Sequence, residues 1–385
     1  MMTQELIHPT DSAIVSGSAT PSIKTPPTVA RMDTDWGRVA VRTKLYPRLV
    51  QSNRQGEAPQ RQSAPATPTP HRWGIVLAGG DGVRLRELTE WVWGDPRPKQ
   101  FCPLLGERTL LEEARDRAQR SVPPEQILYS VTRTHEEYYL PCLADRPSQT
   151  IVQPSNKGTA PAILSALMRI AHTDPNAMVV ILPCDHYYSP ESAFTAALES
   201  AFAIGEQRSG SIVLLGVEPK SPEVEYGWIE VGEGIRGHSE LFQVGGFHEK
   251  PPLPRAEALL TDGSLWNTFV MVGRVSAFLE MGRATVPGLL QVLDSWQVIL
   301  PSGECRIPDA VYNRIPSTDF SRQVLSAATD RLLALRLADV EWSDLGDPYR
   351  VLVTLFEKNG YLPDWAKLWP EADTSPHRAS AATAS

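Results

Sequence analysis

Residues 73–101 read WGIVLAGGDGVRLRELTEWVWGDPRPKQF, and this stretch decides the fold. It opens with a short apolar run typical of a buried β-strand, continues through a glycine-rich turn, and then carries Arg84 and Lys99. Glycine lets backbone N–H groups approach phosphate oxygens closely, and the two cations can neutralise a triphosphate. The stretch therefore predicts a phosphate-binding strand–turn unit, with a tight turn carrying surface cations as the alternative.

Two common nucleotide-binding patterns are missing from this stretch. The phosphate loop GxxxxGK[ST] is absent, and the bulky Arg84 stands near the third glycine of the dinucleotide-binding pattern GxGxxG. These departures disfavour an ATPase of the phosphate-loop type and a nicotinamide-dependent dehydrogenase.

The chain from residue 73 to about 365 alternates short β-type runs with helical periodicity, which predicts an α/β fold around a mostly parallel sheet. Strands are predicted at residues 73–78, 126–131, 150–153, 178–182 and 211–217. More closely spaced strands, at 227–231, 241–249 and 268–272, suggest a second subregion folded against the first sheet. Pro190 is expected at the first position of a helix.

Composition divides the chain and limits its class. Residues 1–70 are rich in Ser, Thr, Pro and Gln and predict a flexible leader, 71–366 the folded domain, and 367–385 a flexible tail. The net charge of −8 disfavours a nucleic-acid or membrane-surface partner. Four scattered cysteines without a CxxC pair, and the lack of a signal peptide, favour a cytoplasmic protein.

The quoted stretch resembles the sugar-phosphate nucleotidyltransferases, whose signature runs LAGGxGxRLxPLT…PKQF. Residues 77–85 and 98–101 match it, and PKQF is most like the mannose-1-phosphate guanylyltransferase branch. The resemblance implies a Rossmann-like, mostly parallel mixed sheet with flanking helices, of the GT-A-like kind. It assigns nucleotide binding to Leu77, Ala78, Gly79, Gly80 and Gly82. Arg86 and Glu87, and a longer connection to Lys99, depart from the family pattern.

Three further residues are assigned to the nucleotide by a second segment, QPSNKGTAP at 153–161, which resembles the family's base-recognition element. Small residues there would let a purine lie against the backbone, with Gln153, Gly158 and Thr159 as contacts. The alternative is a helix N-terminus capped by Thr159.

A metal site is expected from two carboxylates. Asp185 ends an apolar strand, where ligands of open α/β sheets gather, and Asp344 lies in a segment that resembles the family's W-x-D-x-G element. The resemblance implies that both bind Mg²⁺, with loop capping as the alternative for Asp185. His186 is expected to orient its loop, and Asp347 is left unassigned.

The sugar side is implied by three later segments. Tyr226, Gly227, Glu249 and Asn267 would bind the sugar, and Lys250 would hold its phosphate. A solvated strand end is the alternative for Glu249 and Lys250. Two further features are noted: Phe269 replaces a small residue of the family pattern, which changes the expected pocket size, and residues 317–320 are expected to help close this side.

The resemblance implies transfer of a nucleotidyl group from GTP to mannose 1-phosphate, giving GDP-mannose and pyrophosphate. Arg84, Lys99, Asp185 and Lys250 are the expected catalytic residues. Alternatives are another nucleotide and sugar 1-phosphate, or a catalytically silent sugar-nucleotide-binding regulator. The oligomeric state stays open, with a homodimer as one alternative. No hexapeptide repeat or isomerase-like region follows the matched segments, so a single activity is expected.

Overall fold

The computed structural model describes residues 71–294, 298–299 and 303–370. All of them belong to one unit, Asn53–Ser385. The leader predicted at 1–70, and residues 371–385 of the tail predicted at 367–385, lie outside the described residues.

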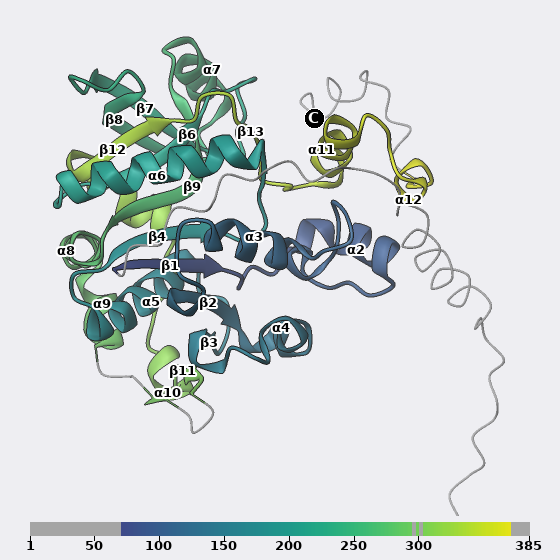
Figure 1. The fold of residues 1–385 in the computed structure, drawn as a ribbon, viewed down its shortest axis with the longest axis horizontal. Helices are drawn as coiled ribbons and strands as arrows, with labels where there is room; N and C mark the ends of the chain where they lie inside the picture. The colour runs from purple at the N-terminus through teal and green to yellow at the C-terminus, as the bar shows by residue number, and fades with distance from the viewer. Residues whose placement is uncertain (1–70, 295–297, 300–302, 371–385) are drawn as a thin grey trace, which may run out of the picture. The chain divides into compact units, whose positions relative to one another are not determined.

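Parallel strands form one half of the central sheet (Figure 1). β1 (Arg72–Leu77) pairs in parallel with β2 (Ile127–Thr132) and with β4 (Met178–Pro183). β3 (Thr150–Gln153) adds to β2, and β11 (Cys305–Arg306) adds to β3. Because these strands all run the same way, the loops after β1 and β4 meet at one edge of the sheet. The strands predicted here from hydrophobic runs are confirmed to within one residue at either end.

The other half of the sheet is mostly antiparallel. β9 (Leu265–Arg274) lies between β4 and β6 (Ile212–Val217) and is antiparallel to both. β12 (Leu332–Arg336) is parallel to β6, and then come β8 (Leu241–Glu249) and β7 (Gly227–Gly234). β7 also pairs with β9, so these five strands form a closed hydrogen-bonded circuit.

The prediction of a second subregion folded against the first sheet is wrong in one respect. The later strands belong to the same eleven-stranded sheet as β1, rather than to a sheet of their own. The physical reason is the ten-residue length of β9, which lets one strand pair with β6 along one edge and with β4 and β7, one after the other, along the opposite edge.

Helices cover both faces of the sheet and bury its side chains. Along β1, Ile75 belongs to one core cluster and the adjacent Val76 to the other, because successive strand residues point to opposite faces. α5 (Thr159–Thr173) and α8 (Val275–Thr285) contribute to the first cluster. The second cluster includes side chains of the helices α3 (Leu110–Gln119) and α6 (Glu191–Gln207). Pro190 is the residue that precedes α6, so the predicted helix start was one residue early.

A third apolar cluster joins α2 (Arg86–Trp93), α11 (Pro348–Asn359) and α12 (Asp364–Lys367), which lie beside one another in Figure 1. Asp347 begins α11 by accepting a hydrogen bond from the Arg350 N–H at 2.9 Å, which gives this previously unassigned residue a capping role.

The remaining strands and α-helices are β5 (Tyr187–Ser189), β10 (Val298–Ile299), β13 (Glu341–Ser343), α4 (Glu136–Leu143), α7 (Leu253–Thr261), α9 (Pro287–Leu293) and α10 (Asp309–Tyr312). In the part of the chain that the structure describes, no helix has the length and apolarity needed to cross a bilayer.

Candidate functional site

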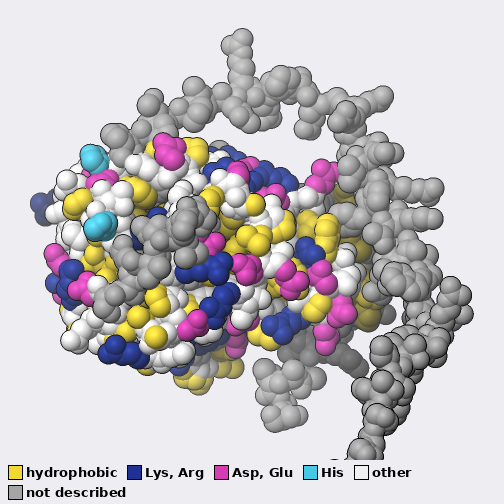
Figure 2. Space-filling model, turned by 90° about the horizontal axis from the view of Figure 1, so that it is seen from below, with side chains coloured by type: hydrophobic (Ala, Val, Ile, Leu, Met, Phe, Trp, Pro, Cys, Tyr) yellow, Lys and Arg dark blue, Asp and Glu magenta, His cyan; other side chains and the backbone are white. Residues whose placement is uncertain are grey.

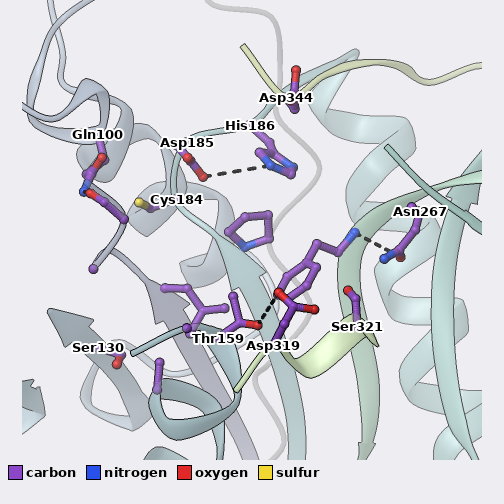
Figure 3. A pocket seen from close by; sticks show the side chains of 18 of the residues that line it. Gln100, Ser130, Thr159, Cys184, Asp185, His186, Asn267, Asp319, Ser321 and Asp344 are labelled. Atoms are coloured by element: carbon purple, nitrogen blue, oxygen red, sulfur yellow. Dashed lines mark hydrogen bonds and ion pairs between the residues drawn. The ribbon is translucent and has the colours of Figure 1, made fainter. Parts of the chain in front are cut away.

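A pocket of about 390 Å³ opens at the carboxyl ends of β1 and β4 and reaches β7, β8 and β9 (Figure 3). It brings together most of the residues that the sequence assigned to a site. Its lining includes Leu77, Gly79, Gly80, Gln153, Gly158, Thr159, Asp185, Tyr226, Gly227, Glu249, Asn267 and Asp344. Five assigned residues are not part of this lining, namely Ala78, Gly82, Arg84, Lys99 and Lys250.

The glycine-rich turn is held in shape by Gln100, which sequence reasoning had left without a role. The Gln100 side-chain amide donates to the carbonyl oxygens of Ala78 at 3.1 Å and Gly80 at 2.7 Å. Gly82 has φ of 56°, and a Cβ there would come within 3.1 Å of the Lys99 backbone nitrogen. The buried Ala78 and the half-buried Gly82 therefore shape the turn, while Gly79 and Gly80 face the pocket.

Lys99 lies behind the pocket wall and connects three of its parts. The Lys99 side chain is only 10% exposed, and its ammonium lies 3.2 Å from the Asp185 carboxylate. The same ammonium donates to the backbone carbonyl oxygens of Asp344 at 2.5 Å and Leu345 at 3.1 Å. Lys99 thus fixes the loop after β4 against the loop after β13, and brings Asp185 and Asp344 to the same site.

Asp344 is held by partners that sequence reasoning missed. Its carboxylate accepts hydrogen bonds from the Tyr226 hydroxyl at 3.1 Å, the Gly346 N–H at 2.9 Å and the Arg350 guanidinium at 3.1 Å. Burial opposes ionisation of Asp344, but the positive charges of Arg350 and Lys99 outweigh it and the pKa of Asp344 is lowered. Asp344 therefore stays a carboxylate.

Arg350 couples α11 to the pocket. Besides Asp344, its guanidinium pairs with Glu223 at 2.6 Å and lies 4.5 Å from the centre of the Tyr226 ring. The capping residue Asp347, followed by proline, places Arg350 in the first turn of α11. Nothing local to the sequence indicates that this turn reaches Asp344.

We expect the variant Arg350→Met to be destabilised by about 2 kcal/mol, because it leaves two mostly buried carboxylates without their cation. The measurement is the urea midpoint of unfolding. Arg331→Met is the control, since Arg331 makes an ion pair with Glu280 between exposed groups, which contributes about 1 kcal/mol or less. Equal midpoints for the two variants would contradict a supporting role for Arg350.

Arg84 and Lys250 converge on one carboxylate at the rim of the pocket. The Arg84 guanidinium lies 3.3 Å, and the Lys250 ammonium 3.2 Å, from the same oxygen of Glu225. All three side chains are roughly half exposed, and exposed ion pairs are weak, so an incoming phosphate can compete for the two cations. Sequence reasoning predicted both cations and missed Glu225, which lines the pocket.

The assigned sugar-side residues are in close contact. A Cβ at Gly227 would come within 2.9 Å of the Glu249 carboxylate and 3.4 Å of the Asn267 Cβ, so glycine is needed for this approach. Burial, helped by the negative charge of Asp319, raises the pKa of Glu249 to about 7.

The assigned base-binding segment packs against residues 318–320, which the sequence analysis expected at the sugar side. Gly158 has φ of 91°, and a Cβ there would overlap the Thr318 carbonyl oxygen. The Thr159 hydroxyl accepts from the Phe320 N–H at 2.8 Å. It donates to Asp319 at 3.4 Å, a bond drawn in Figure 3. Capping of α5 by Thr159 is therefore wrong: the capping position is Gly158, and the Thr159 hydroxyl holds the neighbouring segment.

Two neighbours of these residues have defined hydrogen bonds. The Gln153 side chain donates to the Ser130 hydroxyl at 3.1 Å and accepts from Tyr312 at 3.0 Å, so its amide is fixed in the pocket wall. The Trp342 indole donates to His186 Nδ1 at 3.2 Å, and burial lowers the pKa of His186. A neutral His186 fixed in this way fits the expected loop-orienting role.

Asp185 and Asp344 form a donor set that fits Mg²⁺. Both carboxylates line the same pocket, and Mg²⁺ is commonly held by one or two carboxylates with substrate phosphates and water. Among the described residues no group of three or more His, Cys, Asp or Glu side chains is arranged around a metal position. Phosphate oxygens and water would have to complete the coordination.

The site and its fold define a class of protein: an α/β protein with a glycine-rich turn and two carboxylates at the carboxyl edge of its parallel strands. The family is nucleotidyl transferase, whose model matches residues 73–352, and the chain belongs to it.

Similar proteins come from several bacteria. The xanthan biosynthesis protein XanB of Xanthomonas campestris pv. campestris (strain B100) is 30% identical over 297 residues, which are 74% of this chain and 60% of that protein. The mannose-1-phosphate guanylyltransferase of Escherichia coli (strain K12) is 29% identical over 281 residues, covering 71% of this chain and 57% of that enzyme. The chain thus spans 60% or less of the length of these two relatives.

A solved structure agrees with the fold. The Thermus thermophilus protein described as a mannose-1-phosphate geranyltransferase is 28% identical, with a TM-score of 0.63. The match covers 74% of this chain and 79% of that one.

Proposed function

We propose that this protein transfers a guanylyl group from GTP to mannose 1-phosphate, forming GDP-mannose and releasing pyrophosphate. The observation that carries the proposal is the pocket in which the glycine turn, Asp185, Asp344 and the sugar-side carboxylate Glu249 meet. Guanine and mannose are supported by the PKQF segment and by relatives that are named mannose-1-phosphate guanylyltransferases.

The chemistry is an in-line displacement. A phosphate oxygen of the sugar 1-phosphate attacks the α-phosphorus of the nucleotide, a new P–O bond forms, and the bond to the bridging oxygen of pyrophosphate breaks. The nucleophile is already anionic, so the protein's contribution is alignment and charge stabilisation. Asp185 and Asp344 would hold Mg²⁺, which would supply positive charge to the phosphate groups when bound.

Each protein cation has a place in this scheme. Arg84 and Lys250 leave their shared exposed partner Glu225 for the phosphates, Lys250 holding the attacking phosphate and Arg84 the departing pyrophosphate. Lys99 stays in its buried position, where it fixes the position of Asp185 relative to the backbone of Asp344.

The test is Mg²⁺-dependent pyrophosphate release from purified protein over a grid of nucleoside triphosphates and sugar 1-phosphates. A maximum at GTP with mannose 1-phosphate supports the proposal. A maximum with another substrate pair supports nucleotidyl transfer but contradicts the assignment of GTP and mannose 1-phosphate as the substrates. No release from folded protein that still binds nucleotide contradicts an enzymatic role.

That last outcome corresponds to a second candidate, a sugar-nucleotide-binding regulator. It is favoured by one observation: protein cations already contact both carboxylates, Lys99 at Asp185 and Arg350 at Asp344. A nucleic-acid partner is not favoured, because basic and acidic side chains are interspersed on the face drawn in Figure 2.

We expect Glu249→Gln to raise the KM for the sugar 1-phosphate while leaving kcat unchanged, because Glu249 contributes binding that is equal in ground and transition states. In the wild type the group is neutral below about pH 7 and a carboxylate above it. A carboxylate accepts hydroxyl hydrogen bonds more strongly, so the wild-type KM should fall as pH rises through 7.

The Glu249→Gln variant should show a KM that is independent of pH over this range. Steady-state kinetics at several pH values measure both effects. The same pH profile in wild type and variant would show that another group is responsible.

A further inference from the structure

An irregularity in β9 pushes two residues out of the sheet beside the pocket. Leu215 of β6 pairs with Val270, but the next residue, Gly216, pairs with Asn267. Thr268 and Phe269 therefore have no partner on β6, as in a β-bulge.

Side chains of the bulge stabilise it from within. The Thr268 hydroxyl donates to the Leu215 carbonyl oxygen at 2.7 Å and accepts from the Val270 N–H at 3.3 Å. The Asn267 side-chain oxygen accepts from the Phe269 N–H at 3.1 Å, a bond drawn in Figure 3 at Asn267. The residue at position 269 is thus held in place by hydrogen bonds that do not involve its own side chain.

Phe269 occupies this position at a conformational cost. Its φ is 63°, in the left-handed region that glycine and asparagine adopt readily and that aromatic residues seldom adopt. Such strain persists where the surroundings enforce it and is concentrated at functional sites. Glycine would give the same backbone without strain, so the ring itself needs an explanation.

The ring has two environments. It packs against the first core cluster, the one to which α5 and α8 contribute. It also lines the pocket, together with Asn267, Glu249 and Gly227. Polar groups for sugar hydroxyls and an apolar ring therefore share the same end of the pocket. This combination suits a pyranose, which presents hydroxyl groups at its rim and C–H bonds on its face.

We propose that Phe269 determines the sugar specificity of this pocket. The ring packs against the C–H face of an unsubstituted hexose 1-phosphate and occupies the space that an acetamido substituent would need. This inference rests on the proposed function and adds the chemical class of sugar that the site accepts.

The experiment compares mannose 1-phosphate with N-acetylmannosamine 1-phosphate and N-acetylglucosamine 1-phosphate in the full-length protein. Phe269→Asn and Phe269→Gly remove the ring and keep residues that tolerate the left-handed backbone, while Phe269→Tyr keeps the ring. The readouts are kcat/KM for each sugar and the dissociation constant of each sugar 1-phosphate, measured by calorimetry.

We expect the preference for mannose 1-phosphate over at least one acetamido sugar to fall by about 10-fold or more in Phe269→Asn and Phe269→Gly. Phe269→Tyr should keep the wild-type preference, and the KM for the nucleotide should stay the same in all three variants. An unchanged preference in folded Phe269→Asn and Phe269→Gly would overturn the inference and leave the ring a packing role.

The two hypotheses can fail separately. If the wild-type protein releases no pyrophosphate with any substrate pair, the proposed transferase function fails. Phe269 can still be tested by the ratio of the dissociation constants for mannose 1-phosphate and an acetamido sugar 1-phosphate. If this ratio is the same in the wild type and in Phe269→Asn and Phe269→Gly, the ring does not select the sugar.

Discussion

Replacing Lys99 by alanine is expected to lower kcat for pyrophosphate release by about 100-fold or more, the effect typical of losing one preorganised charged group. Its ammonium contacts Asp185 and two backbone carbonyl oxygens while only 10% of the side chain is exposed. Without the ammonium, the loops after β4 and β13 lose the donor that joins them, and Asp185 and Asp344 are no longer held in their relative positions. Steady-state pyrophosphate release at saturating substrates measures the effect.

Because Lys99 is nearly buried, the alanine variant has to be separated from a folding defect. Lys99→Met keeps the length of the side chain and removes the charge, so it should fold and still lose turnover. Lys367→Ala is the matched control, since Lys367 is exposed and pairs with Asp364 of its own helix. Wild-type turnover in Lys99→Met would show that the ammonium has no part in the reaction.

The variant Asp185→Asn is expected to lose about 100-fold or more in kcat, because asparagine keeps the shape of the side chain and removes its charge. Asp185 lines the pocket and faces both Lys99 and His186, at 3.2 Å and 3.9 Å. The loss should be accompanied by weaker binding of the divalent cation, measured without turnover by electron paramagnetic resonance of Mn²⁺ added to the complex with GTP.

Asp145→Asn is the control for Asp185→Asn, because Asp145 is a surface carboxylate with 72% of its side chain exposed. It should leave both turnover and Mn²⁺ binding unchanged. Full Mn²⁺ affinity in Asp185→Asn would remove Asp185 from the metal site, even if turnover fell.

The local sequence was sufficient to predict the strands of the parallel half of the sheet and the glycine turn. β3 was predicted residue for residue, because its apolar run is short and bounded by polar residues. The glycine turn, Asp185 and the base-binding segment each follow a strand directly, so the strand direction alone places them at one edge of the sheet. Twelve of the seventeen assigned site residues do line the pocket.

The sequence predicted less about side chains whose hydrogen bonds or ion pairs are made with residues far away along the chain. Arg84 and Lys250 were assigned directly to phosphates, but in the structure they meet at Glu225. Gln100 lies in the PKQF segment, but that segment does not indicate its structural role, because its two acceptors are backbone carbonyls about twenty residues earlier. Hydrogen bonds to backbone groups distant along the chain leave no local pattern in the sequence.

The sequence by itself determined the α/β class, the glycine-rich turn and the two candidate carboxylates, because each depends on residues that are neighbours along the chain. Only the tertiary structure decided that β7 closes a circuit with β9, that Arg350 holds Asp344, and that the bulge in β9 turns Phe269 into the pocket. These features depend on strand register and on contacts between distant segments. Such contacts form only when the whole sheet has assembled, because the free energy of burying the two faces sets the register that brings them together.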